Sequence, residues 1–291
     1  MTTIGKVLTK ATAALSDAAV DNARLEARLL LAHSLALSPA QVFGRADQDL
    51  QDDQVAAFGK ILTQRCAGAP LAHITGRREF WSLEFKVSPA TLIPRPDTET
   101  LIELAVEIYE LNVPPKTILD LGTGSGCILL ALLSCFPGAA GTGVDVSAEA
   151  CEVARENARA LGYEERCRII NAPWSDGISG EYDLIVSNPP YIPSNDINGL
   201  QTDVREHEPM GALDGGPDGL DAYREILPLA EKSLSHEGIL IVEFGIGQAR
   251  EVAQLAVSAG LQPGTVRSDL GGIERVSSFY KKSIGIAEAT G

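Results

Sequence analysis

A glycine-rich segment is the first part of the sequence whose residues are spaced for chemistry. It reads Ile118-Leu119-Asp120-Leu121-Gly122-Thr123-Gly124-Ser125-Gly126, an apolar strand that runs into a turn. Glycine is needed where a turn requires unusual backbone angles or a ligand must approach the main chain closely. The segment predicts a site for a nucleotide-derived cofactor, and a tight turn that binds nothing is the alternative. A dinucleotide fingerprint would place its third glycine at position 127, where this chain has Cys127.

Asp145 ends the next predicted strand, 19 residues beyond Gly126. A carboxylate at this position can accept hydrogen bonds from both hydroxyls of an adenosine ribose. This arrangement suits S-adenosylmethionine and NAD equally. A helix cap is the other common role for an aspartate at a strand end, but Ser147 is better placed for it.

The segment Asn188-Pro189-Pro190-Tyr191 directly follows another apolar strand, at the edge where open α/β sheets bind ligands. Two consecutive prolines fix the backbone and carry no N–H, so their carbonyls are left as acceptors. The side-chain oxygen of Asn188 and the carbonyl of Pro189 can therefore hold one NH2 group from two directions. Tyr191 offers a flat apolar face to the planar group that carries the NH2.

Such a grip suits methyl transfer to an amide nitrogen. That nitrogen is a poor nucleophile because its lone pair is delocalised into the carbonyl, whereas the methyl of a sulfonium is a strong electrophile that needs only in-line attack. Two acceptors position the nitrogen and stabilise the positive charge that develops on it. No metal and no activated base is needed, so the pattern favours S-adenosylmethionine as the cofactor.

The elements that must position these residues alternate between short apolar strands and helices, which is typical of a parallel sheet wrapped by helices. Helices are predicted at 127–136, 147–161 and 220–235. Strands are predicted at 117–121, 141–146, 168–171, 183–187 and 239–244, and a final pair at 262–267 and 276–281 would add antiparallel edges.

The first 75 residues predict a small helical bundle, since Leu25, Leu29 and Leu30 recur at helical spacing and breakers stand near Ser38-Pro39 and 68–70. Residues 80–87 switch to a period of two, which predicts a strand with Trp81 and Phe85 on one face, half of a hairpin. Asp97 is the predicted N-cap of a helix that extends to about Glu110.

Composition narrows the class of protein. With 291 residues, 45% hydrophobic and 22% charged, the chain is typical of a globular protein with two domains. The net charge of −15 argues against a nucleic-acid backbone as the main partner. Residues 1–78 carry 9 Lys/Arg and 7 Asp/Glu, whereas the remainder carries 15 and 32. This difference in charge predicts that the two parts of the chain have different functions.

Neither a signal peptide nor a membrane span is visible, which predicts a cytoplasmic protein. Five scattered cysteines and four single histidines indicate neither disulfides nor a metal site.

Taken with the stretches that flank them, these motifs make the chain resemble the release-factor glutamine methyltransferases, the PrmC/HemK family. The flanking stretches are Pro70 to Gly76, Leu92 to Glu99, Glu208-Pro209 with Ala212 to Gly216, and Asp269-Leu270-Gly271. The likeness covers about residues 20–282. His73 and Ile273 depart from the family pattern, which expects an aromatic residue at the first position and a more polar one at the second.

The resemblance implies a Rossmann-like, seven-stranded class I methyltransferase domain at 97–291, a helical substrate-recognition domain at 1–76 and a β-hairpin linker at 77–96. It implies that the substrate is the glutamine of a Gly-Gly-Gln motif in peptide chain release factors. The contacts implied for S-adenosylmethionine are Gly122, Thr123, Gly124, Ser125, Gly126, Asp145, Trp174 and Asn188. Asn188, Pro189, Pro190 and Tyr191 would hold the glutamine, with catalysis carried by Asn188, Pro189 and Tyr191, and Arg95 would order the loop over the cofactor.

Four other functions stay open from the residues alone. An adenine-N6 methyltransferase could use the same grip on a flipped base, and a ribosomal-protein glutamine methyltransferase would use identical chemistry. A dehydrogenase would explain the glycine segment and Asp145 but not Asn188 to Tyr191. An adaptor could bind the cofactor without turnover.

Overall fold

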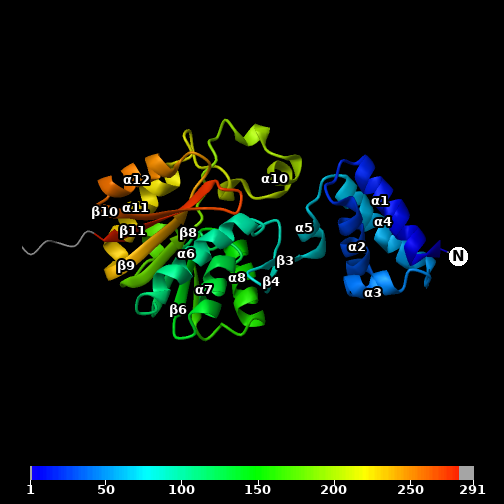
Figure 1. Ribbon diagram of the computed structural model, residues 1–291, viewed down its shortest axis with the longest axis horizontal. Coiled ribbons are helices and arrows are strands. Elements are labelled where there is room, and N and C mark those ends of the chain that lie inside the picture. Colours follow the sequence, from blue (N-terminus) through cyan, green and yellow to red (C-terminus); the bar gives the residue numbers. More distant parts are fainter. Residues whose placement is uncertain (1, 282–291) are drawn as a thin grey trace, which may run out of the picture. The chain divides into compact units, whose positions relative to one another are not determined.

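The computed structural model describes residues 2–281, and the chain divides into two compact units (Figure 1). One unit comprises Met1–Arg77 with Gln201–His207, and the other comprises Arg78–Leu200 with Glu208–Gly291. Met1 of the predicted helical domain and residues 282–291 of the predicted methyltransferase domain lie outside the described residues.

The first unit is helical, as predicted. Its helices are α1 (Ile4–Asp17), α2 (Ala23–Ser34), α3 (Pro39–Gly44), α4 (Asp52–Cys66) and α5 (Leu71–Thr75), with α10 (Thr202–His207) added from later in the chain. The two-residue strands β1 (Thr2–Thr3) and β2 (Asp49–Leu50) pair antiparallel. Ile4, Leu15, Leu30 and Phe58 are buried at its core. The predicted break at Ser38-Pro39 is confirmed, because Ser38 caps α3 and Pro39 begins it.

The strand predicted at residues 80–87 forms half of a hairpin as expected, but its predicted bounds are wrong. The chain turns inside it, so that β3 (Arg77–Phe80) and β4 (Leu83–Lys86) form a two-stranded sheet. Trp81 and Ser82 make the turn with φ values of 51° and 58°. Two positive φ values in succession are what a tight hairpin turn needs, but they are rare for residues other than glycine, asparagine and aspartate. The apolar alternation through Trp81 therefore concealed the turn.

The predicted N-cap Asp97 is also wrong. Asp97 lies inside a 3-10 turn, η1 (Pro96–Thr98), and α6 (Glu99–Glu110) follows it directly. The Asp97 carboxylate accepts instead a hydrogen bond from Arg275 at 3.3 Å. The 3-10 turn that leads into α6 thus contacts a residue 178 positions away in the sequence.

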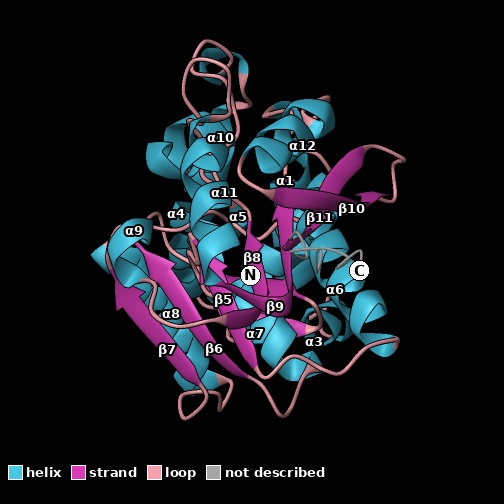
Figure 2. Cartoon of the chain, turned by 90° about the vertical axis from the view of Figure 1, so that its left-hand side faces the viewer, coloured by secondary structure: helices cyan, strands magenta, loops and turns pink. Residues whose placement is uncertain are grey.

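The second unit is built on a seven-stranded sheet in the order β10-β11-β9-β8-β5-β6-β7 (Figure 2). These strands are β5 (Thr117–Leu121), β6 (Ala140–Asp145), β7 (Cys167–Asn171), β8 (Tyr182–Ser187), β9 (Leu234–Glu243), β10 (Leu261–Ser268) and β11 (Glu274–Lys281). Strands β5 to β9 are parallel, and β11 runs antiparallel to both β9 and β10. The predicted seven-stranded α/β fold is confirmed. The last predicted pair is antiparallel as expected, but only β10 is an edge strand.

Helices cover both faces of this sheet. On one face, α6 and α7 (Cys127–Cys135) pack on Ile118, Leu184 and Ile241. On the other face, α11 (Asp221–Ser233) and α12 (Ala249–Ser258) pack on Leu119, Ile185 and Val242. The remaining helices are α8 (Ala148–Ala160), the one-turn α9 (Trp174–Gly177), and the 3-10 turns η2 (Ile197–Gly199) and η3 (Met210–Ala212). Adjacent residues of the central strands are buried against opposite faces, which explains why these strands read as continuous apolar runs.

Candidate active site

The predicted site residues follow three adjacent parallel strands. The glycine segment follows β5, Asp145 ends β6, and Asn188 follows β8. Because β5 lies between β6 and β8, the carboxyl ends of all three strands meet at one edge of the sheet. Connections leave this point toward opposite sides of the sheet, which is where α/β folds bind ligands.

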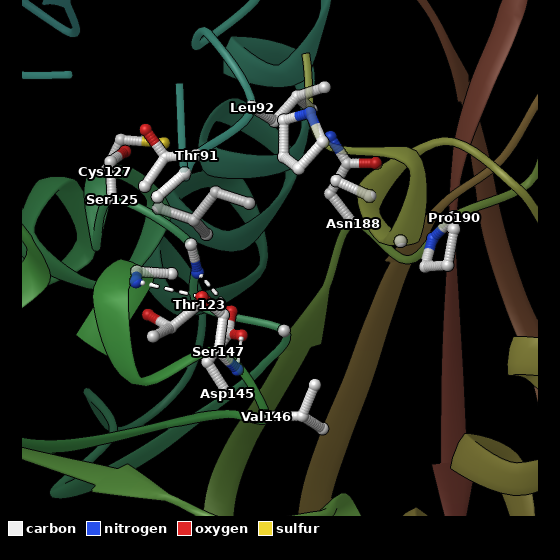
Figure 3. A pocket seen from close by; sticks show the side chains of 18 of the residues that line it. Thr91, Leu92, Thr123, Ser125, Cys127, Asp145, Val146, Ser147, Asn188 and Pro190 are labelled. Carbon is white, nitrogen blue, oxygen red and sulfur yellow. Dashed lines mark hydrogen bonds between the residues drawn. The ribbon is translucent and has the colours of Figure 1, made fainter. Parts of the chain in front are cut away.

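A cavity of about 600 Å³ opens at this edge, a size that suits a nucleoside-derived ligand (Figure 3). Eight predicted residues line it: Gly122, Thr123, Gly124, Ser125, Asp145, Trp174, Asn188 and Pro190. Gly126, Pro189 and Tyr191 are not among its lining residues. Figure 3 shows Asn188 beside Leu92 on one side of the cavity, with Asp145 and Ser147 on another.

The glycine segment forms a backbone cradle. Gly122 and Gly124 have φ values of 76° and 56°, which side chains disfavour. A Cβ at Gly122 would lie 3.7 Å from the Trp174 ring, so the absence of a side chain leaves the cavity open between them. The amides of Gly122 and Thr123 both donate to the Val144 carbonyl, at 2.9 and 3.1 Å, which ties the turn to β6.

The Asp145 carboxylate stabilises this backbone cradle through hydrogen bonds. Its Oδ2 accepts from the amide of Gly124 at 2.8 Å, and its Oδ1 accepts from the amide of Ser147 at 2.9 Å. A carboxylate has about four acceptor positions, so roughly two remain for a ligand's hydroxyl groups. Ser147 caps α8, as predicted, since its side chain accepts from the amide of Ala150. Asp145 is therefore not needed as the helix cap.

Asn188 is oriented by a partner from a distant segment. Its Nδ2 donates to the Thr98 hydroxyl at 3.1 Å, and its Oδ1 makes no hydrogen bond within the described residues. Just before it, the buried Ser187 hydroxyl donates to the Leu121 carbonyl at 2.6 Å and ties the ends of β8 and β5 together. The asparagine thus presents an unused acceptor at the cavity.

Tyr191 points elsewhere. Its hydroxyl donates to Glu243 Oε1 at 3.4 Å, and its carbonyl accepts from Gln248 Nε2 at 3.0 Å. Burial raises the pKa of Tyr191, and the nearby Glu243 carboxylate raises it further. The tyrosine is a neutral anchor that attaches the Asn188 loop to β9 and the segment after it.

Sequence reasoning missed Thr98 and Glu243 as individual residues. Thr98 lies in the cavity wall and contacts Asn188, which is 90 residues further along the chain. Glu243 is the last residue of β9 and follows four consecutive apolar residues, 239–242. β9 lies beside β8, the strand that leads to Asn188. An acidic residue at the carboxyl end of a buried strand was the available signal.

Two further segments complete the cavity wall, one at Thr91 to Arg95 and the other at Pro209 to Ala212. Arg95 forms an ion pair with Glu208, whose side chain is only 1% exposed. Both segments overlap the flanking stretches that carried the family resemblance.

Within residues 2–281, no three or more His, Cys, Asp or Glu side chains are grouped so that they could hold a metal ion. In the same part of the chain, no helix has both the length and the apolar composition for crossing a bilayer.

Comparison with known proteins identifies the domains and the fold. Residues 6–76 match the profile of the PrmC N-terminal domain, and residues 101–203 match that of the methyltransferase small domain. A crystal structure of a methyltransferase from Pyrococcus furiosus has a TM-score of 0.51 at 16% identity, covers 77% of this chain and 98% of its own, and shares the fold. The fold and the site define a class I methyltransferase that uses S-adenosylmethionine.

Two relatives are similar over nearly the whole chain. A release factor glutamine methyltransferase of Rhodospirillum rubrum is 44% identical over 97% of this chain and 86% of its own length. The enzyme of the same name from Bradyrhizobium diazoefficiens is 45% identical over 92% of each chain. The chain belongs to the release factor glutamine methyltransferase family.

Proposed function

We propose that this protein transfers a methyl group from S-adenosylmethionine to the side-chain amide nitrogen, N5, of the glutamine in the Gly-Gly-Gln motif of peptide chain release factors. The observation that carries this proposal is Asn188. Thr98 engages its NH2 group, so its Oδ1 is free to accept from an amide at the cavity. The names of the relatives support a release factor as the substrate.

The cavity residues fit the cofactor. The main chain of Gly122 to Gly124 leaves room for a close approach, and the unused acceptor positions of Asp145 suit the two ribose hydroxyls. Trp174 lines the same cavity and offers an aromatic surface. When bound, S-adenosylmethionine supplies a methyl group on a sulfonium, which is a strong electrophile.

The chain's own part in the reaction is to hold and polarise the amide. Asn188 Oδ1 and the Pro189 carbonyl would accept the two N–H bonds of the glutamine, which fixes the nitrogen and favours its pyramidal form as positive charge develops. The new N–C bond forms as the methyl–sulfur bond breaks, and one amide proton then leaves to solvent. Pro190, which lines the cavity, would contact the glutamine side chain next to these two acceptors. Tyr191, for which we expected stacking on the amide, would act through anchoring the loop.

The domains would divide these tasks. Residues 1–76 would recognise the release factor, residues 77–96 would link the parts through the hairpin, and residues 97–291 would carry the chemistry. We place the reaction in the cytoplasm, where peptide release takes place. The excess of Asp and Glu after residue 78 makes direct contact with nucleic acid unfavourable and disfavours an adenine-N6 activity.

Mass spectrometry of a release factor incubated with the protein and S-adenosylmethionine tests the proposal. We expect a gain of one methyl group on the Gly-Gly-Gln glutamine. Asn188→Ala, compared in parallel, should lower turnover by at least about a hundredfold because it removes an interaction needed when the nitrogen attacks. Methylation of DNA, RNA or a ribosomal protein with an unmodified release factor would overturn the proposal.

A further inference from the structure

We propose that Gln248 is a positioning residue for methyl transfer, because its side-chain amide holds the loop that carries the Pro189 carbonyl. The inference rests on the proposed function, in which Asn188 Oδ1 and the Pro189 carbonyl accept the two N–H bonds of the glutamine. Thr98 orients the first of these acceptors. Gln248 fixes the second.

The side chain of Gln248 connects two segments at the carboxyl edge of the sheet. Its Nε2 donates to the Tyr191 carbonyl at 3.0 Å, and its Oε1 accepts from the amide of Gly245 at 2.9 Å. The Tyr191 carbonyl can only accept and the Gly245 amide can only donate, so these two contacts settle which way the Gln248 amide faces. Gly245 lies two residues beyond the end of β9, the neighbour of β8. Gln248 therefore attaches the loop after β8 to the chain that leaves the adjacent strand.

The segment 213–219, which leads into α11, packs closely against the same loop. A Cβ on Gly215 would lie 2.8 Å from the Pro190 carbonyl oxygen, and one on Gly219 would overlap the Tyr191 carbonyl oxygen. Only a residue without a side chain fits at such distances. The main chain of this segment thus limits where the loop can lie.

The two prolines transmit the constraint at Tyr191 back to the Pro189 carbonyl. This carbonyl lies between the ψ torsion of Pro189 and the φ torsion of Pro190. A proline has a fixed φ, and the residue before a proline has a restricted ψ, so both torsions are restricted. The Pro189 carbonyl therefore moves only with the loop as a whole. If Gln248 released the loop, the second acceptor would shift while Asn188 kept the first.

Two oxygen acceptors at one position select glutamine over glutamate. They attract the N–H bonds of an amide and repel the oxygens of a carboxylate. When the Pro189 carbonyl is displaced, one of the two repulsive contacts with a carboxylate is lost, and the preference falls. The preference for glutamine therefore reports on the second acceptor without depending on turnover.

The experiment compares full-length Gln248→Met and Gln248→Glu proteins with the wild type. Met is of similar length and removes both hydrogen bonds of the side chain. Glu keeps an acceptor for the Gly245 amide but places a second acceptor opposite the Tyr191 carbonyl, so we expect the larger loss in Gln248→Glu. Gln254→Glu is the matched control, because Gln254 is exposed on α12 and the change in charge is the same.

Three quantities are measured. In both Gln248 variants kcat on a Gly-Gly-Gln peptide should fall about tenfold or more, because small displacements of reacting groups are costly. On protein saturated with S-adenosylhomocysteine, calorimetry should show that the preference for the Gly-Gly-Gln peptide over the matching Gly-Gly-Glu peptide falls roughly fivefold or more, about the effect of one hydrogen bond. Gln248 is not among the residues that line the cavity, so cofactor affinity should stay within about twofold. Gln254→Glu should match the wild type in all three.

A Gln248→Glu protein with wild-type kcat and preference would show that only the contact with Gly245 matters, and it would overturn the inference. A lower kcat with unchanged preference would also overturn it, because the second acceptor would then be in place. Equal losses of kcat and cofactor affinity, or a variant that circular dichroism shows to be unfolded, would make Gln248 a general structural residue and would have the same consequence. Each of these results leaves the proposed function in place. A wild-type protein that methylates no release factor would overturn the proposed function and this inference with it.

Discussion

Asp145 combines two roles in one side chain, since it supports the glycine cradle and has acceptors left for a ligand. Asp145→Ala should weaken the binding of S-adenosylmethionine by about 1.5 to 3 kcal/mol, the usual loss for hydrogen bonds to a charged group. Isothermal titration calorimetry measures it. Asp145→Asn, which keeps one oxygen for the cradle, should lose less. Unchanged affinity in a folded Asp145→Ala protein would remove this residue from the site.

Asp120 makes folding stability depend on pH. It is fully buried, its Oδ2 accepts from the Thr123 hydroxyl at 2.7 Å, and burial raises its pKa to about 7. The unfolded chain releases this proton near pH 4 and the folded chain holds it until about pH 7, so folding stability should fall as pH rises between these values. Asp120→Asn should remove about 2 kcal/mol of the loss between pH 5 and 7.5, measured by urea unfolding.

Asp183 provides the control for this measurement. Burial acts to raise its pKa, but hydrogen bonds from the amides of Lys116 and Thr117 outweigh that effect and lower it. Its stabilisation is therefore complete above about pH 4 and is lost only as pH falls below that. Asp183→Asn should lower stability equally at pH 5 and 7.5. A pH dependence that Asp120→Asn leaves unchanged would contradict the assignment.

The residues that could be predicted from the sequence are those whose neighbours in space are also neighbours in the chain. The glycine cradle and the Asn188 loop are contiguous motifs, and eight of the predicted residues line one cavity. Thr98 and Glu243 lie 90 and 55 residues from Asn188 in the sequence. The fold alone brings Thr98 to Asn188, and for Glu243 the one local signal was an acidic residue at the carboxyl end of a buried strand.

At the scale of elements, the pattern of apolar residues predicted the central strands correctly but did not predict the turn between β3 and β4. Strands β5 and β8 and the carboxyl-terminal half of β9 are buried on both faces, and their apolar runs identified them. The β3–β4 turn lacks the glycine or asparagine that normally marks such a hairpin. The cap of α6 was misplaced because a 3-10 turn that contains Asp97 precedes the helix.

The two cavity-wall segments, Thr91 to Arg95 and Pro209 to Ala212, are connected by the ion pair of Arg95 and Glu208. Arg95→Ala should increase hydrogen exchange in both segments and weaken cofactor affinity by roughly tenfold, which corresponds to about 1.4 kcal/mol. Arg95→Lys keeps the positive charge, so its hydrogen exchange and cofactor affinity should lie between those of the wild type and Arg95→Ala. Exchange that increases in only one segment would show that the pair does not couple them.

At the scale of the whole molecule, charge separates the parts of the chain: residues 1–78 carry 9 Lys/Arg against 7 Asp/Glu, and the rest carries 15 against 32. A chain starting near Arg77 should still bind S-adenosylmethionine and methylate a short Gly-Gly-Gln peptide. Against a whole release factor its kcat/KM should fall roughly tenfold or more, because about 1.4 kcal/mol of remote binding energy is lost. Steady-state kinetics on both substrates measure this.

Circular dichroism and cofactor affinity are the controls, because the segment Gln201–His207 groups with the first unit and would lose its neighbours in the shortened chain. Equal losses on peptide and protein would mean that the first unit supports the active site rather than recognition.

The interior position of β11 has a consequence for synthesis. A chain emerges from the ribosome with its N-terminus first. The last strand to emerge, β11, lies between β9 and β10 and pairs with both. Asp145, Asn188 and Glu243 all emerge before it. Until residues 274–281 emerge, β9 keeps an open edge, and open edges recruit strands from other chains. A premature stop before Glu274 would therefore yield a product that carries these three residues and aggregates, so the nascent chain depends on its final strand for solubility.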